Sequence, residues 1–159
     1  MKRIENREIL QQVRKETSEK IEKSRCRILI CAGTGCLAGG SGEIYEKMCE
    51  LTAENPDVDV FFGPEIAHTE AEQKTGPVEV KKSGCHGFCE MGPLMRIEPM
   101  GILYTKVQLS DFEEIFHRTI ERGDVIRHLL FKQDGIEYKK QEEIPFYKKQ
   151  TRNVLKNCG

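Results

Sequence analysis

Two pairs of cysteines, each in a glycine-rich loop, constrain this chain more than any other feature of its sequence. The first pair lies in the run Cys31-Ala-Gly-Thr-Gly-Cys36 and the second in the run Cys85-His-Gly-Phe-Cys89, with 48 residues between them. The first pair begins near the end of one short stretch, 27–32, and the second pair follows another, 78–82; the pattern of both stretches predicts a β-strand. Because an α/β sheet presents ligands in the loops at its strand ends, we expect the four thiols to meet at one edge.

Four converging thiolates favour a metal centre. A structural zinc site usually has tighter pairs, with two residues between the cysteines. A thioredoxin-type redox pair requires a C-x-x-C motif, which this sequence does not contain. Plain core cysteines would not explain two glycine-flanked pairs. The pattern therefore favours a 2Fe–2S cluster whose ligands are Cys31, Cys36, Cys85 and Cys89, while zinc, a disulfide and core packing stay open as alternatives.

Five glycines near these cysteines are expected to let the backbone approach the sulfur atoms and point N–H groups at them. Such contacts stabilise a negative centre and adjust its reduction potential. The glycines are Gly33, Gly35, Gly84, Gly87 and Gly92.

Other side chains near the motif are expected to have smaller roles. His86 lies between two of the cysteines and is interpreted as a polar neighbour of the centre, because a Rieske-type centre needs two histidines. Cys26 and Cys49 are interpreted as packing residues and Cys158 as an exposed thiol. The stretch from Gly33 to Ala38 also fits the G-x-G-x-x-A dinucleotide fingerprint, but that reading leaves the second cysteine pair unexplained.

Composition and charge narrow the class of protein further. The chain has 159 residues, 38% of them hydrophobic and 32% charged, which predicts one domain with a modest core and solvated extensions. The net charges are +2 for residues 1–24, −6 for 25–131 and +3 for 132–159. This distribution argues against nucleic-acid binding, which needs a dense cationic stripe. No apolar run is long enough to enter a membrane, and seven cysteines without a signal peptide predict a cytoplasmic protein.

The remaining hydrophobic patterns predict a small α/β fold. The expected elements are strands 27–32, 58–62 and 78–82, a hairpin of 94–98 and 102–107, and helices 5–24, 43–54 and 111–122. Ser41 or Gly42 is expected to cap the second of these helices and Ser110 the third. The polar stretch 63–77 is expected to hold one helical turn around Ile66–Lys74, and the apolar segment 125–131 to pack on the last helix.

The motifs resemble one known family. Three runs carry the resemblance: the first cysteine loop, the run GCHGFCEMGPL from Gly84 to Leu94, and the run GILYTKV from Gly101 to Val107. They are similar to the thioredoxin-like 2Fe–2S ferredoxin domain at the N-terminus of the flavoprotein subunit of NAD(P)-linked iron hydrogenases and NADH dehydrogenases. The resemblance covers about residues 25–131 and implies the same four cysteine ligands.

The resemblance also implies an organisation and a function. Residues 1–24 would be a helical extension, and 132–159 a linker that leads into a truncated FMN- and NADH-binding domain, whose opening the end of the chain resembles. The domain would relay single electrons near a flavin site, as a non-catalytic part of an NAD(P)H-linked oxidoreductase. Its partners would be the flavin domain of the parent chain and other iron–sulfur, hydrogenase or dehydrogenase subunits. The parent chain would also hold FMN, NAD(P)H and further clusters. A free-standing ferredoxin shuttle and a zinc-stabilised interaction domain are the alternatives.

Overall fold

A four-stranded mixed sheet lies at the centre of the computed structural model, which describes residues 3–23, 26–56, 58–60, 74–76, 78–151 and 153. In sheet order the strands are β4 (Val78–Ser83), β1 (Cys26–Cys31), β5 (Met95–Glu98) and β6 (Ile102–Tyr104). β1 runs parallel to β4 and antiparallel to β5, and β5 is antiparallel to β6. The carboxyl ends of β1 and β4 therefore meet at one edge, where Cys31 is in register with Ser83. The predicted α/β class is confirmed.

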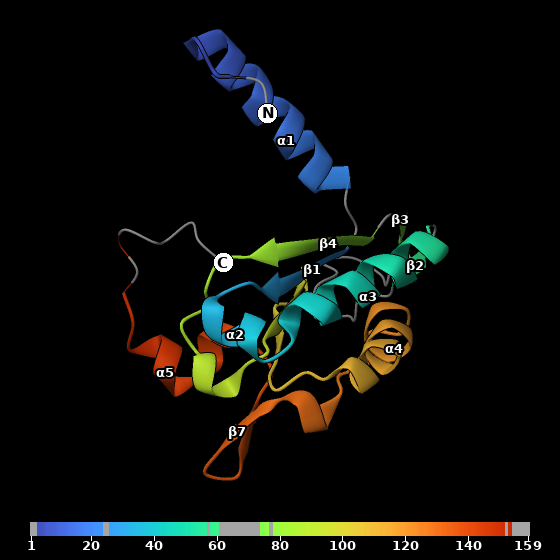
Figure 1. Ribbon diagram of the computed structural model, residues 1–159, viewed down its shortest axis with the longest axis vertical. Coiled ribbons are helices and arrows are strands. Elements are labelled where there is room, and N and C mark those ends of the chain that lie inside the picture. The colour runs from blue at the N-terminus through green and yellow to red at the C-terminus, as the bar shows by residue number, and fades with distance from the viewer. Residues whose placement is uncertain are drawn as a thin grey trace.

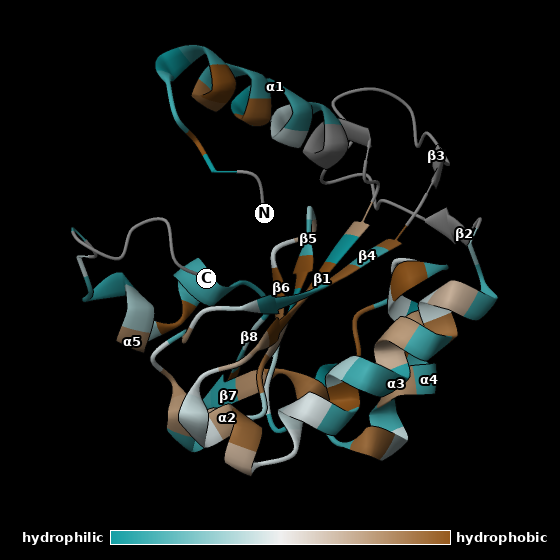
Figure 2. Cartoon of the chain, turned by 45° about the horizontal axis from the view of Figure 1, so that its top comes forward, coloured by the Kyte–Doolittle hydropathy of each residue, from teal (hydrophilic) through white to brown (hydrophobic). Residues whose placement is uncertain are grey.

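Two helical segments cover one face of this sheet (Figures 1 and 2). They are α3 (Ser41–Glu54) and the short α4 (Phe112–Glu114), which continues into a six-residue π-helix, η3 (Ile115–Ile120). Alternate residues of β1 point into the core that these helices share with the sheet. The largest buried members of this core are Ile28, Ile30, Met48, Met95, Ile97, Ile102, Tyr104, Ile115, Phe116 and Ile120. Burial of this apolar surface is the main stabilising contribution to the fold.

The predicted hairpin and the packing of the apolar segment after the last helix are both confirmed. β5 and β6 pair with Ile97 opposite Ile102, and Gly101 in the connecting turn has a φ of +66°. Within 125–131, Ile126 and Leu129 are buried in the same core as the helices. This segment includes the short 3-10 helix η4 (Arg127–Leu129).

Both predicted helix caps are wrong. α3 begins at Ser41 itself and its cap is Gly40, whose φ of +92° gives the sharp turn that precedes the helix. Ser110 lies inside a 3-10 turn, η2 (Leu109–Asp111), that precedes α4. There Gln108 donates its backbone N–H to the Asp111 carboxylate at 2.8 Å. In both cases the direction of the chain entering the helix outweighs the capping preference of serine.

The N-terminal helix α1 (Arg7–Lys23) stands away from the sheet (Figure 1). Its N-terminus is capped by Asn6, whose side-chain oxygen accepts the Ile9 N–H at 2.8 Å. From Arg3 to Glu19 every side chain is exposed except the half-buried Ile9. The prediction of a mostly solvated helix is confirmed for these residues.

A separate two-stranded sheet is formed by β2 (Val58–Val60) and β3 (Lys74–Gly76). The predicted strand over 58–62 is confirmed as far as Val60. The predicted helical turn does not include Lys74, because Lys74 pairs with Val60 in this ladder. The rest of that prediction lies outside the described residues, as do Phe61, Phe62 and Cys158.

The segment after residue 131 packs against the domain. It contains the hairpin β7 (Phe131–Gln133) and β8 (Ile136–Tyr138), the 3-10 turn η5 (Gln141–Glu143) and α5 (Pro145–Lys148). Ile144 and Tyr147 are buried beside Leu94 and Leu103 in a second hydrophobic cluster. The expected boundary at 131 therefore does not mark the end of the packed structure, because apolar residues beyond it complete this cluster.

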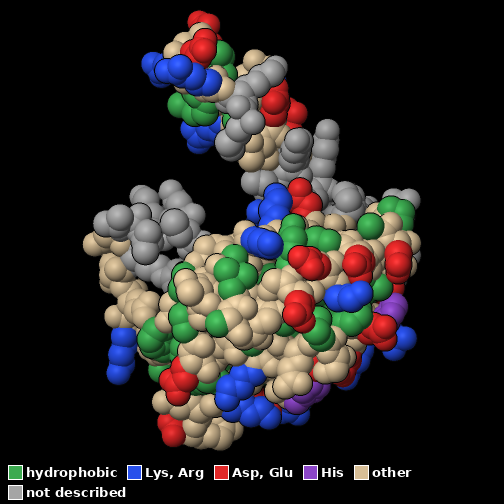
Figure 3. All heavy atoms as spheres, in the orientation of Figure 1, with side chains coloured by type: hydrophobic (Ala, Val, Ile, Leu, Met, Phe, Trp, Pro, Cys, Tyr) green, Lys and Arg blue, Asp and Glu red, His purple; other side chains and the backbone are tan. Residues whose placement is uncertain are grey.

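Charged side chains of both signs lie on the surface of the domain (Figure 3). On the face seen in Figure 3, acidic and basic side chains are interspersed. Among the residues that the structure describes, no helix is both long enough and apolar enough to cross a bilayer.

Candidate metal centre

The first cysteine pair lies inside the protein. Cys31 is the last residue of β1, and its N–H donates to the Leu94 carbonyl at 3.0 Å. Cys36 lies in the short helix α2 (Thr34–Ala38), which begins directly after Gly33. Both side chains are buried, at 1% and 0% exposure, and they hydrogen-bond each other. Strand β1 and the tight turn into α2 thus fix this inner pair.

The second pair lies at the surface. Cys85 follows β4, and Cys89 begins the 3-10 turn η1 (Cys89–Met91). Both are exposed, and their sulfur atoms are 4.0 Å apart. Hydrogen bonds from Met91 N–H to the Phe88 carbonyl, at 3.0 Å, and from Gly92 N–H to the Cys89 carbonyl, at 3.1 Å, hold the turn. We call Cys85 and Cys89 the outer pair.

Three of the five predicted glycines lie directly against the cysteines. A Cβ added to Gly33 would be 3.0 Å from Cys85 Sγ, and one added to Gly35 would be 3.2 Å from Cys89 Cβ. A Cβ on Gly92 would be 2.8 Å from Cys36 Sγ. These distances are shorter than ordinary van der Waals contact, so only glycine leaves the sulfur atoms where they are.

The other two predicted glycines act in the outer loop itself. Gly87 has a φ of +78°, and its N–H donates to Cys85 Sγ at 3.3 Å. This is the predicted backbone contact to sulfur. The Gly84 carbonyl accepts a hydrogen bond from Ser83 Oγ at 3.2 Å, so Gly84 contributes to the start of the loop.

The electrostatics join the two pairs into one site. Burial raises the pKa of Cys36 to about 11, assisted by the hydrogen bond to Cys31 and by the charges of Cys31 and Cys89, while the Leu94 N–H opposes the rise. The pKa of Cys89 is also raised, first by its hydrogen bond with Cys85. These thiols are protonated at neutral pH, so a metal that binds thiolate must displace their protons.

The donors are arranged as two pairs. Across the described ranges of the chain, no three Cys, His, Asp or Glu side chains converge as the shell of one metal ion. Two thiolates on one tetrahedral metal, with bonds of about 2.3 Å, lie about 3.8 Å apart. The 4.0 Å separation of the outer pair is close to that value. The outer pair is therefore spaced as two thiolates on one metal ion would be.

Of the two described cysteines outside the four, Cys26 has the expected packing role, and Cys49 is half-buried. Cys26 is 1% exposed in the main core, and burial, with the charge of Glu98, raises its pKa to about 12. Cys49 lies on α3 and hydrogen-bonds Tyr45, whose pKa it raises.

The G-x-G-x-x-A motif of residues 33–38 leaves no space for a bound dinucleotide. Its first two glycines, Gly33 and Gly35, face Cys85 and Cys89 at contact distance, where a pyrophosphate would have to lie.

Two sets of contacts around the site escaped sequence reasoning: those of Phe88 with α5, and the distant hydrogen-bond partner of His86, which is itself predicted as a polar neighbour. Phe88, between the outer cysteines, stacks on Phe146 of α5 with ring centroids 4.8 Å apart and contacts Tyr147 edge-on at 5.6 Å. His86 is 1% exposed and is hydrogen-bonded to Ser83 and Gln141. The available signal for the first set was Pro145, which begins α5 as prolines often begin helices.

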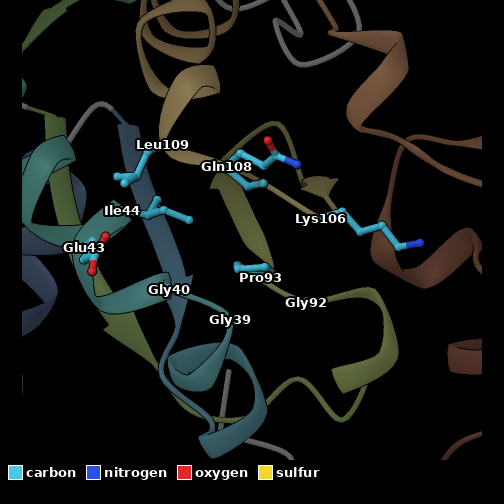
Figure 4. A pocket seen from close by; sticks show the side chains of 10 residues that line it. Gly39, Gly40, Glu43, Ile44, Gly92, Pro93, Lys106, Gln108 and Leu109 are labelled. Carbon is cyan, nitrogen blue, oxygen red and sulfur yellow. The ribbon is translucent and has the colours of Figure 1, made fainter.

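A hollow of about 440 Å³ lies beside the site, between α3 and the chain that follows β6 (Figure 4). Gly92 and Pro93 form part of its wall, together with Gly40, Glu43 and Leu109. None of the four cysteines lines it, so it is separate from the thiol cluster.

Comparison with known proteins finds similar sequences among ferredoxins. A 2Fe-2S ferredoxin of Clostridium pasteurianum is 40% identical over 52 residues, which are 33% of this chain and 51% of that protein. A 2Fe-2S ferredoxin of Aquifex aeolicus (strain VF5) is 25% identical over 95 residues, which are 60% of this chain and 71% of that protein. The chain thus matches about half the length of the first relative. No family model matches the chain.

Solved structures agree with the sequence comparison. A thioredoxin-like [2Fe-2S] ferredoxin from Aquifex aeolicus superimposes with a TM-score of 0.51 at 18% identity, covering 70% of this chain and 94% of that one. A second structure of the wild-type protein gives 0.50 at 19% identity, with 69% and 99% coverage. The chain has the thioredoxin-like ferredoxin fold. The predicted fold is confirmed, and the two similar sequences are named 2Fe-2S ferredoxins.

Proposed function

We propose that this thioredoxin-like domain is a one-electron carrier that holds a 2Fe–2S cluster on Cys31, Cys36, Cys85 and Cys89. The observation that carries the proposal is the arrangement of the four thiols as two pairs within one glycine-lined site. A 2Fe–2S cluster requires two thiolates on each iron, whereas a single zinc ion requires one shell of four. The two similar ferredoxins, named as 2Fe-2S proteins, give independent support.

The residues of the chain supply thiolates, hydrogen bonds and exclusion of water. The Leu94 N–H approaches Cys36 and the Gly87 N–H approaches Cys85, and both favour the charged sulfur that metal binding needs. The buried inner pair excludes solvent from one side of the site, while the outer pair remains open to a partner. When bound, the cluster accepts and releases one electron. Neither a general acid nor a nucleophile is part of this proposal.

The test is anaerobic reconstitution followed by metal analysis. We expect two irons and two acid-labile sulfides per chain, and a spin-half paramagnetic resonance signal after reduction with dithionite. A colourless protein with one zinc ion and no labile sulfide would overturn the proposal in favour of a zinc-stabilised interaction domain. Reconstitution with iron and sulfide that yields no visible absorption would also overturn it.

We further propose that this carrier acts beside a flavin in an NAD(P)H-dependent complex, a hydrogenase or an NADH dehydrogenase. The support is the motif resemblance over about 25–131 and the C-terminal run from Lys149, which is similar to the opening of an FMN- and NADH-binding domain. Its partners would be that flavin domain and other iron–sulfur subunits. A free-standing ferredoxin is the second candidate, because the two similar proteins are themselves named ferredoxins.

The two contexts differ in the size of the polypeptide that carries this domain in the cell. An antibody against the domain should detect a chain far larger than 18.2 kDa that contains FMN and oxidises NADH. Detection of an 18 kDa protein that exchanges electrons with several separate enzymes would instead support the free-standing ferredoxin.

A further inference from the structure

The outer cysteine loop is attached to a distant part of the chain through the ring of His86. This ring is 1% exposed, although it lies between two exposed cysteines. Its Nε2 is 2.8 Å from Ser83 Oγ at the end of β4, and its Nδ1 is 3.1 Å from Gln141 Oε1 in η5. Ser83 is a neighbour in sequence, but Gln141 is 55 residues away. Closure of the loop therefore depends on a residue that no local pattern connects to it.

The contacts of Gln141 fix the direction of its hydrogen bond with His86. Arg96 Nη1 donates to Gln141 Oε1 at 3.0 Å, so this atom is the amide oxygen and accepts only. His86 Nδ1 must therefore carry the proton and donate to it. His86 Nε2 lies 2.8 Å from Ser83 Oγ, whose single hydrogen also has the Gly84 carbonyl within reach at 3.2 Å. Loss of the Gln141 oxygen would leave a buried N–H donor without this acceptor.

Gln141 is itself held firmly in position. Its side chain is 8% exposed, and Arg96, which binds it, also pairs with Glu98 and with Glu142 at 3.5 Å. The preceding backbone is joined to β6, since the Leu103 N–H donates to the Lys139 carbonyl at 3.0 Å. The Gln141 amide oxygen is therefore held in place relative to the sheet. The His86 ring that donates to this oxygen is held in place as well.

We propose that Gln141 is a positioning residue for the metal centre: through His86 it holds the outer cysteine loop in the conformation that pairs Cys85 with Cys89. The proposal rests on the proposed function, because its effect on the centre requires a cluster at these thiols. It also makes a claim about the loop alone, which is measurable without metal. The C-terminal segment that carries Gln141 then helps to hold the outer cysteines in position.

The test compares Gln141→Met, which keeps the side-chain length and removes the acceptor, with Gln141→Glu, which keeps an acceptor oxygen for both His86 and Arg96. Gln150→Met is the matched control, since Gln150 is exposed in the same segment. In metal-free protein, amide hydrogen exchange of residues 87–92 should become about tenfold faster in Gln141→Met, which corresponds to loss of one hydrogen bond of about 1.4 kcal/mol. Gln141→Glu and Gln150→Met should match the parent protein.

The reconstituted proteins provide the second measurement. The g-values and line shape of the reduced cluster should change in Gln141→Met, because the outer sulfurs shift, and should be preserved in Gln141→Glu and Gln150→Met. Parental exchange rates and spectra in Gln141→Met would overturn the inference and leave the proposed function standing. Absence of a cluster signal in the parent protein would overturn the proposed function, while the exchange experiment would still test the attachment of the loop.

A third variant covers the case in which Gln141→Met does not fold. Gln141→Asn withdraws the amide oxygen from His86 by about the length of one methylene group. Exchange in 87–92 should then be faster than in Gln141→Glu. Equal exchange in these two variants would overturn the inference.

Discussion

Gly92 offers a direct way to test whether the site depends on close approach of backbone to sulfur. Its φ of −72° and ψ of 163° are accessible to any residue, so Gly92→Ala introduces no backbone strain. The added methyl carbon would be 2.8 Å from Cys36 Sγ and 3.2 Å from the Cys89 carbonyl oxygen. The substitution therefore acts on a sulfur of the inner pair and on the backbone of an outer cysteine, with no other cause of damage.

The size of the effect follows from these contacts. The sulfur must move back by at least about 0.6 Å, from 2.8 Å to the 3.4 Å at which ordinary contact with the methyl carbon begins. Metal–sulfur distances tolerate only about ±0.2 Å, so the change exceeds what a bound cluster can absorb. In metal-free protein, overpacking of this kind costs roughly 1–3 kcal/mol of unfolding free energy.

The assay is iron and sulfide content after anaerobic reconstitution, together with urea unfolding of the metal-free protein. Gly92→Ala should bind well under half of the parental iron and should unfold at lower urea concentration. Gly42→Ala is the control, because its added carbon would be 3.8 Å from Leu37 Cδ2, an ordinary contact, and alanine is favoured over glycine in a helix by up to about 1 kcal/mol. Full iron content and an unchanged reduced spectrum in Gly92→Ala would refute the argument that the glycine is needed for sulfur placement.

Three further predictions concern other buried or ligating groups. Cys85→Ser should destroy or strongly alter the cluster while Cys49→Ser leaves it intact, and equal iron content in the two variants would contradict the ligand assignment. Tyr104→Phe should lower the free energy of unfolding by about 1–3 kcal/mol, because the Tyr104 hydroxyl bonds Thr119 Oγ1 at 2.7 Å and accepts the Ile126 N–H at 3.1 Å; an unchanged urea midpoint would show that this buried network is dispensable. The raised pKa of Cys26, about 12 against the usual 9.0, means that its contribution is complete below pH 9 and is lost as the pH rises to about 12, to the extent of about 4 kcal/mol. Unfolding free energies of the metal-free protein measured from pH 8.5 to 11 should fall less steeply in Cys26→Ala than in the parent, and parallel curves would contradict the prediction.

The cysteine site was predictable because its signals are local and its assembly follows from topology. Strands β1 and β4 are parallel, so the loops after them share one edge, and each loop supplies one closely spaced pair. The contacts of Gly33, Gly35 and Gly92 with sulfur follow from the same placement. The spacing of the cysteines in the sequence does not show which thiols are buried. Cys31 and Cys36 are buried because they are part of the second hydrophobic cluster.

The residues that escaped prediction share a physical reason: their partners are far away in the sequence. Ile144 and Tyr147 form too short an apolar pattern to indicate burial, and they are buried because Leu94 and Leu103 leave a surface for them. The pairing of His86 with Gln141 has no periodicity at all. Serine is the better helix cap by propensity, but the turn before α3 requires a positive φ, which Gly40 provides. That requirement depends on how the chain enters the helix in the folded structure, and the local sequence does not show it.

The second hydrophobic cluster, which includes both Cys31 and Tyr147, has a consequence for how the protein folds during its synthesis. A ribosome delivers the chain from its N-terminus, so all four cysteines emerge before the segment that closes their surroundings. During that interval Phe88 lacks its ring partners in α5, and His86 lacks the acceptor on Gln141. The inner thiols, Cys31 and Cys36, therefore pass through a period in which they are present but not yet covered by Ile144 and Tyr147.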